Sequence, residues 1–162
     1  MPASRGRSSR RSRAASAKHS STTSRAIAAA SIENSRFTWR ADVLREVPAA
    51  IRFISAEPLL GSLFENGGQR QPLTLDLVDW LIVGGESGTW ARPLDLRWAV
   101  ELATAWDDAN VAFFMKQLGT IAGRTAGARD RKGGDLSVFP ADLQRRELPR
   151  IATSSELEAT CS

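Results

Sequence analysis

The sequence predicts an α/β protein, built as a partial (βα) barrel or an open parallel sheet, with a disordered basic N-terminal tail. Three observations lead to this fold class. Apolar runs without strict alternation recur along the chain, and such runs are typical of parallel strands covered on both faces. Helix-like segments separate these runs, as in successive βα units. The first 25 residues contain no aromatic residue and almost no apolar residue besides alanine.

The chain divides into three predicted regions. Residues 1–30 form the disordered Arg/Ser-rich tail, residues 31–150 the α/β half-barrel domain, and residues 151–162 a frayed C-terminal tail. A chain of 162 residues has room for about one domain. No run approaches the roughly 18 consecutive apolar residues that a membrane span needs. We therefore expect a cytoplasmic protein without membrane contact.

The elements of the domain follow from apolar runs and their capping residues. Strands are predicted at four apolar runs, residues 27–32, 50–56, 79–85 and 111–119. Thr38 is the expected N-cap of a first helix, which Pro48 ends, and residues 61–72 read as loop. Asp95 is the expected cap of the most regular helix, at 94–110. The first helix carries four apolar residues at helical spacing, Trp39, Val43, Leu44 and Val47.

Charge is unevenly distributed along the chain. The sequence pI of about 10.2 suggests a partner such as nucleic acid. Residues 1–32 contain seven Lys and Arg and no acid, whereas the remainder has 15 bases against 18 acids, a net charge of −3. The tail is therefore predicted to bind nucleic acid weakly and without sequence specificity. A plain solvated tail and an organellar transit peptide are the competing interpretations.

Each predicted strand ends in a charged residue: Glu33, Glu57, Glu86, and in the last strand Lys116 with Gln117 beside it. Because the carboxyl ends of parallel strands lie at one rim, we expect these side chains to converge on a ligand site. Gly84 and Gly85 would let a ligand approach the backbone closely. Arg92 would clamp a carboxylate or a phosphate. The competing interpretation is structural, with each Glu capping a turn or forming a salt bridge.

Glu86 separates these two interpretations best. We predict that it faces a ligand rim shared with Glu57 and Lys116, so that Glu86→Gln is neutral or mildly stabilising. A purely local cap would instead lose stability on this substitution. Trp90, in the loop after Glu86, is predicted to touch the ligand. Residues 128–135 (ARDRKGGD) are a loop with a second interpretation as a phosphate-gripping segment.

Several segments resemble an uncharacterised family of phage and bacterial proteins. They are SIENSRFTWRADVLREVPAAIRFISAEPLLG, DWLIVGGESGTWARPLD, VAFFMKQLG, GARDRKGGD and FPADLQRRELP, in this order between Ser31 and Pro149. That family carries a cysteine cluster of the radical-SAM type near its N-terminus. The resemblance implies a partial (βα) barrel with Glu57, Glu86 and Lys116 at its mouth. For the full-length protein it implies an iron–sulfur cluster and S-adenosylmethionine.

The sequence departs from this family in its cysteines. An iron–sulfur cluster needs several thiolates, and the chain has only Cys161. We therefore expect a truncated or split protein that binds no cofactor or metal itself, is not catalytic alone, and retains the ligand rim. Its expected partner is the missing N-terminal half or another protein, and no catalytic residue is assigned.

Two other functions are open at this point. In the first, the chain is a binding module whose acidic body contacts a protein while the basic tail contacts nucleic acid. In the second, it is a hydrolase with paired carboxylates, which would need two of Glu33, Glu57 and Glu86 at working separation.

Overall fold

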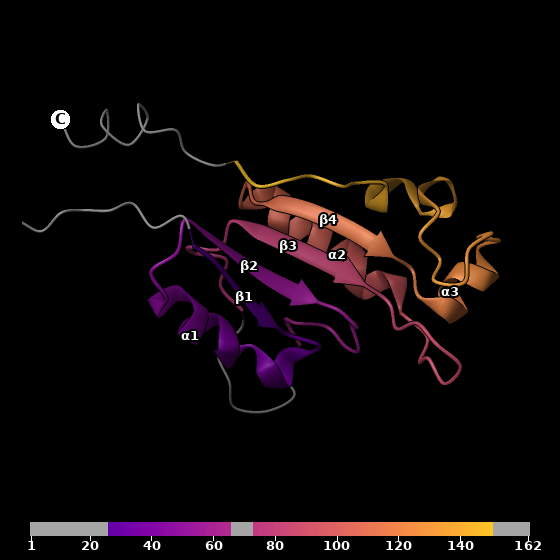
Figure 1. The fold of residues 1–162 in the computed structure, drawn as a ribbon, viewed down its shortest axis with the longest axis horizontal. Helices are drawn as coiled ribbons and strands as arrows, with labels where there is room; N and C mark the ends of the chain where they lie inside the picture. The colour runs from indigo at the N-terminus through magenta and orange to yellow at the C-terminus, as the bar shows by residue number, and fades with distance from the viewer. Residues whose placement is uncertain (1–25, 66–72, 151–162) are drawn as a thin grey trace, which may run out of the picture.

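A computed structural model describes residues 26–65 and 73–150; predictions for residues 1–25 and 151–162 lie outside this part of the chain. Four parallel strands form one sheet in the order β1-β2-β3-β4 (Figure 1). They are β1 (Ile27–Ser31), β2 (Ile51–Ala56), β3 (Trp80–Gly84) and β4 (Ala112–Gln117). The α/β class with an open parallel sheet is thereby confirmed. The sheet begins at Ile27, four residues inside the segment that the sequence assigned to the tail.

The helices are α1 (Trp39–Glu46), α2 (Leu96–Asp108) and the short α3 (Thr120–Thr125). Three 3₁₀ turns accompany them, η1 (Ser35–Phe37), η2 (Leu136–Val138) and η3 (Ala141–Leu143). Asp95 caps α2 as predicted, because its carboxylate accepts a hydrogen bond from the Arg97 N–H at 3.0 Å. Thr38 occupies the N-cap of α1, but its hydroxyl donates to the Ser35 carbonyl and caps no helix N–H. Sequence analysis placed no helix after Gly119, so α3 is an addition.

The buried face of α1 differs from the predicted one. Ala41 and Leu44 are the buried residues of this helix, whereas Trp39, Val43 and Val47 are exposed. The helix packs on β1 and β2, at one side of the sheet, so only a narrow stripe of it meets the core. Helical spacing identified the helix, but which residues of the stripe are buried depends on the orientation of the helix over the strands.

Both long helices cover the same face of the sheet. Alternate strand residues join Ala41, Leu44 and the apolar side of α2 in one core; they are Ala28, Ala30, Ile54, Ala56, Leu81, Val83, Phe113 and Met115. The strands follow one another in chain order without reversal, and both helices lie on one side of the sheet.

The other face of the sheet carries aromatic side chains that stay half-buried. The Phe53 and Trp80 rings lie 5.4 Å apart, and the Trp80 and Phe114 rings lie 5.9 Å apart, edge to face. These three residues alternate with the core residues along their strands. They are not part of the core that the strands form with the helices. The predicted cover on both faces is therefore wrong for the part of the chain that the structure describes. The apolar residues of this face pack across strands on one another instead of beneath a second layer.

The two edges of the sheet differ. Residues 145–147 pair antiparallel with β4, with Met115 N–H donating to the Arg145 carbonyl and Glu147 N–H to the Phe113 carbonyl. Within residues 26–65 and 73–150, no strand pairs with the outer edge of β1. No helix in these same ranges is long and apolar enough to cross a membrane.

Candidate functional site

The carboxyl ends of the four strands form a rim, beyond which α3 and the loop after β3 extend (Figure 1). At this rim Glu57, just after β2, forms an ion pair with Lys116 of β4, with 2.9 Å between Oε2 and Nζ. The two side chains span the intervening strand β3 at Gly84. A Cβ at Gly84 would lie 3.1 Å from the Glu57 side chain, so the glycine leaves room for this pair. Three predicted site residues thus lie together, and their part in ligand binding stays a prediction.

Glu86 is bound to Arg92 within its own loop. Its carboxylate accepts three hydrogen bonds from this residue, from Nε at 2.7 Å, Nη2 at 3.0 Å and the backbone N–H at 2.9 Å. The side-chain hydrogen bonds, followed by the backbone one, lower the pKa of Glu86 from 4.5 to about 2. Among the described residues, no hydrogen bond or ion pair joins Glu86 to Glu57 or Lys116. The hydrogen bonds between Glu86 and Arg92 close the loop that follows β3.

Gly85 has a packing role that the sequence did not suggest. A Cβ on this residue would lie 2.1 Å from the Leu118 carbonyl oxygen, so the two backbones touch here. Gly85 N–H also donates to the Gln117 carbonyl, and the buried Gln117 amide returns a hydrogen bond to the Gly85 carbonyl at 3.0 Å. The space beside Gly85 is therefore filled by the protein itself and is not open to a ligand.

Glu33 lies apart from the Glu57–Lys116 pair. Its carboxylate binds Arg40 of α1 at 3.3 Å, and Arg40 also donates to the Ser31 carbonyl. Its backbone carbonyl accepts a hydrogen bond from Leu60. The structure therefore separates the predicted site residues into three groups, Glu57 with Gly84 and Lys116, Glu86 with Arg92, and Glu33 with Arg40.

A cavity of about 690 Å³ opens at the rim beyond β3 and β4. Its walls come from the loop after β3 (Ser87, Gly88, Thr89), from α3 (Thr120, Ile121, Arg124) and from residues 128–132. We call it the cationic pocket. Four of its residues are basic and exposed: Arg124, Arg129, Arg131 and Lys132.

These cations lack an ion-pair partner in the described part of the chain, although Arg129 interacts electrostatically with Asp135. No ion pair within the described residues involves any of the four. The one carboxylate in the wall, Asp130, accepts hydrogen bonds from the backbone N–H groups of Lys132, Gly134 and Asp135. These bonds, that from Gly134 first, lower the pKa of Asp130. With four cations against one ionised carboxylate, the residues that line the pocket carry a net positive charge.

Thr120 joins the walls of the cationic pocket. Its hydroxyl accepts a hydrogen bond from Gly88 N–H and donates one to the Arg131 carbonyl, both at 3.0 Å. Its backbone N–H donates to the Glu86 carbonyl. Sequence reasoning singled out residues 128–135 but missed α3 and the contribution of Ser87 to Thr89. The alternation of Gly and hydroxyl residues in GESGT was the available signal.

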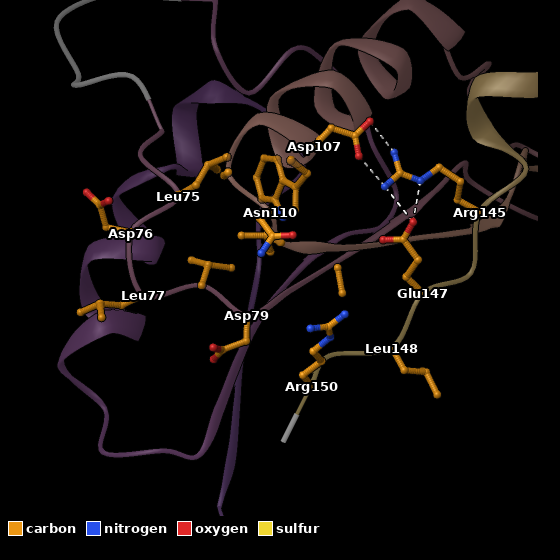
Figure 2. Close-up of a pocket in the computed structure, with 15 residues that line it drawn as sticks. Leu75, Asp76, Leu77, Asp79, Asp107, Asn110, Arg145, Glu147, Leu148 and Arg150 are labelled. Atoms are coloured by element: carbon orange, nitrogen blue, oxygen red, sulfur yellow. Dashed lines mark hydrogen bonds and ion pairs between the residues drawn. The ribbon is translucent and has the colours of Figure 1, made fainter. Parts of the chain in front are cut away.

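A second cavity, of about 1030 Å³, lies at the opposite end of the sheet (Figure 2). Its walls come from residues 75–79 before β3, from residues 106–107 and 109–112, which run from the end of α2 to the start of β4, and from Arg145, Glu147, Leu148 and Arg150. Figure 2 shows Arg145 between Asp107 and Glu147, with nitrogen–oxygen distances of 2.6 and 2.8 Å. We call this cavity the acidic pocket. It faces the amino ends of the strands, whereas ligands of parallel α/β sheets bind at the carboxyl ends. The cationic pocket is therefore the better candidate site.

The Glu86–Arg92 pair leads to a prediction on stability. We now expect Glu86→Gln to lower the thermal midpoint at pH 7, contrary to the neutral or stabilising effect expected from the sequence. Because the pKa of folded Glu86 lies below its unfolded value, the ionised carboxylate stabilises the folded state above pH 4.5. That contribution is lost as the pH falls from about 4.5 towards 2.

Thermal melts of wild type and Glu86→Gln between pH 7 and pH 2 test this expectation. The difference in midpoint between the two proteins should shrink at the acid end of the series. An equal or higher midpoint for Glu86→Gln at pH 7 would restore the interpretation of Glu86 as an unpaired rim carboxylate.

Comparison with known proteins identifies a family. The description "Protein of unknown function (DUF5131)" matches residues 6–145. The match includes most of the basic segment, although the resemblance seen in the sequence begins only near Ser31. A search of curated proteins gave no match, and a search of solved structures gave none. Since residues 6–145 make up most of the 162-residue chain, the protein belongs to the DUF5131 family.

Proposed function

We propose that this chain binds a phosphate-bearing ligand in the cationic pocket at the rim of its sheet. The observation that carries this proposal is the group of four basic side chains around one cavity, none of which forms an ion pair with another described residue. Guanidinium groups donate to phosphate in a fixed fork, and lysine adds a point charge. The volume of about 690 Å³ is that of a small-molecule site.

Other features of the rim support the same ligand class. The Ser87 and Thr89 hydroxyls lie in the wall of the pocket and supply further hydrogen-bond donors. Thr120 holds the loop after β3 against residues 128–132, so the donors are in place before a ligand arrives. The neighbouring Glu57–Lys116 pair provides a carboxylate and an ammonium group for other polar groups of a ligand.

The family resemblance extends this proposal to a barrel of the radical-SAM-like type, of phage origin. The sequential strand order and the helices on one face support a barrel, and the open aromatic face is where further units or a partner would pack. The residues present do not fit an iron–sulfur cluster, which takes several cysteine thiolates, because Cys161 is the chain's one cysteine. Nor do the described residues contain three clustered metal ligands. We therefore propose ligand binding without catalysis by this chain alone.

Calorimetric titration with inorganic pyrophosphate tests the phosphate site. We expect saturable binding to the full chain that weakens as salt is raised. Each charge-assisted hydrogen bond contributes about 1.5–3 kcal/mol, so the double variant Arg131→Ala/Lys132→Ala should bind at least about tenfold more weakly. Arg36→Ala removes an exposed cation far from the pocket and should bind as wild type. Absence of binding to wild type, or an equal loss in Arg36→Ala, would refute the proposal.

A binding module for protein and nucleic acid is the second candidate. The acidic pocket favours this candidate, because its lining residues carry more acidic than basic groups. The acids are Asp76, Asp79, Asp107 and Glu147, and the bases are Arg145 and Arg150. Leu77 and Leu148, 64% and 70% exposed, offer apolar contacts at the same pocket. In this proposal a basic partner protein docks on that end of the sheet, and the N-terminal basic segment contacts nucleic acid.

A further inference from the structure

We infer, on the basis of the proposed phosphate site, that its ligand is a nucleotide unit whose base stacks on Trp90. Trp90 is 93% exposed, the largest exposed fraction of any large apolar side chain in the described part of the chain. An exposed indole leaves a large apolar surface in contact with water, which is unfavourable. Large apolar side chains that stay exposed are often part of a binding site. Trp90 has no packing role that would explain its position.

The loop that carries Trp90 is held at both ends. Glu86 and Arg92 close it with three hydrogen bonds, and Gly88 N–H donates to the Thr120 hydroxyl of α3. The indole is therefore carried by a loop whose backbone is fixed by hydrogen bonds. A ligand that stacks on it meets a surface that is already ordered, which reduces the entropic cost of binding.

Trp90 follows directly on the wall of the cationic pocket. Thr89 lines that pocket, and neighbouring Cα atoms are about 3.8 Å apart. In this inference one ligand places a phosphate among Arg124, Arg131 and Lys132 and its aromatic ring on Trp90, which adjoins the pocket wall along the chain. A cationic groove beside an exposed aromatic ring is the general arrangement for nucleotides and single strands, because every base has a π-face.

The chemistry shared by a free nucleotide and a single strand is a phosphate joined to a base. The probes are therefore inorganic pyrophosphate, the mononucleotide ATP, and a single-stranded DNA of ten thymidines, each titrated into the full chain. Base stacking contributes about 1–3 kcal/mol by alanine substitution, which corresponds to roughly five- to 150-fold in affinity. We expect Trp90→Ala to weaken binding of ATP or of the oligonucleotide by that factor and to leave pyrophosphate binding unchanged.

Two further variants complete the design. Trp90→Phe keeps an aromatic face and should retain most of the affinity. Trp39→Ala removes another exposed tryptophan, on α1, and should bind as wild type. Tighter binding of ATP than of the oligonucleotide identifies the ligand as a free nucleotide, and tighter binding of the oligonucleotide identifies it as a single strand.

The outcomes separate this inference from the proposed function. If pyrophosphate binds but Trp90→Ala binds nucleotide as tightly as wild type, the inference is overturned and the phosphate site stands. Trp90 would then be assigned to contact with a protein. No pyrophosphate binding at all would refute the proposed function. If the affinity for the oligonucleotide is the same in wild type, Trp90→Ala and Arg131→Ala/Lys132→Ala, the inference is overturned. The nucleic acid would then be assigned to the basic N-terminal segment.

Discussion

Gly85→Ala is expected to destabilise the protein by about 3 kcal/mol or more. A Cβ at this position would lie 2.1 Å from the Leu118 oxygen, 2.6 Å from its carbonyl carbon and 3.0 Å from Gly119 N. All three are backbone atoms, which cannot rotate away as a side chain does. The ends of β3 and β4 would have to separate, with strain of about 1–3 kcal/mol and a similar cost for each buried hydrogen bond lost with Gln117.

Urea denaturation followed by circular dichroism measures this loss, and Gly84→Ala provides the matched control. At Gly84 the nearest atoms to a new Cβ belong to the Glu57 side chain, at 3.1 Å, and this side chain can rotate away by weakening its ion pair with Lys116. We expect Gly84→Ala to lose less than half as much free energy of unfolding. Equal stability of the two variants would show that the backbones after β3 and β4 do not meet as described.

Phe113→Ala is expected to cost about 3–5 kcal/mol, the range for truncating a buried aromatic residue. Phe113 is fully buried on the helix-covered face of β4, in the core with Leu81 and Trp106. Its neighbour Phe114 lies on the open face, half-buried, in edge-to-face contact with Trp80. Phe114→Ala should therefore cost markedly less, because its ring is only half-buried, with Trp80 at its edge and the Arg146 guanidinium 5.8 Å from its centroid.

This pair of adjacent residues tests the one-sided core of the sheet. Chemical denaturation of both alanine variants gives the two free energies of unfolding under one set of conditions. A cost for Phe114→Ala as large as that for Phe113→Ala would mean that the aromatic face is covered in solution, by another part of the chain or by a second copy. Dependence of the Phe114→Ala stability on protein concentration would then distinguish these two cases.

Local sequence signals predicted most elements of the fold. Apolar runs located all four strands, and the Asp95 cap and helical spacing located α2. These signals suffice because they act within a few residues along the chain. The helix α3 was missed because its packing comes from a distant segment: a Cβ on Gly123 would lie 2.4 Å from the Cα of Gly133. No pattern within residues 120–125 indicates that contact.

The sequence alone indicates that Glu57, Glu86 and Lys116 lie at the rim, because parallel strands bring their carboxyl ends to one edge of the sheet. Tertiary structure decided how those residues pair: Glu57 reaches Lys116 across Gly84, while Glu86 binds Arg92 in its own loop. It also decided that Arg124 and residues 128–132 surround one cavity with the loop after β3. Strand order follows from chain order, but each pairing depends on distances across strands and on the reach of each side chain, which sequence spacing does not encode.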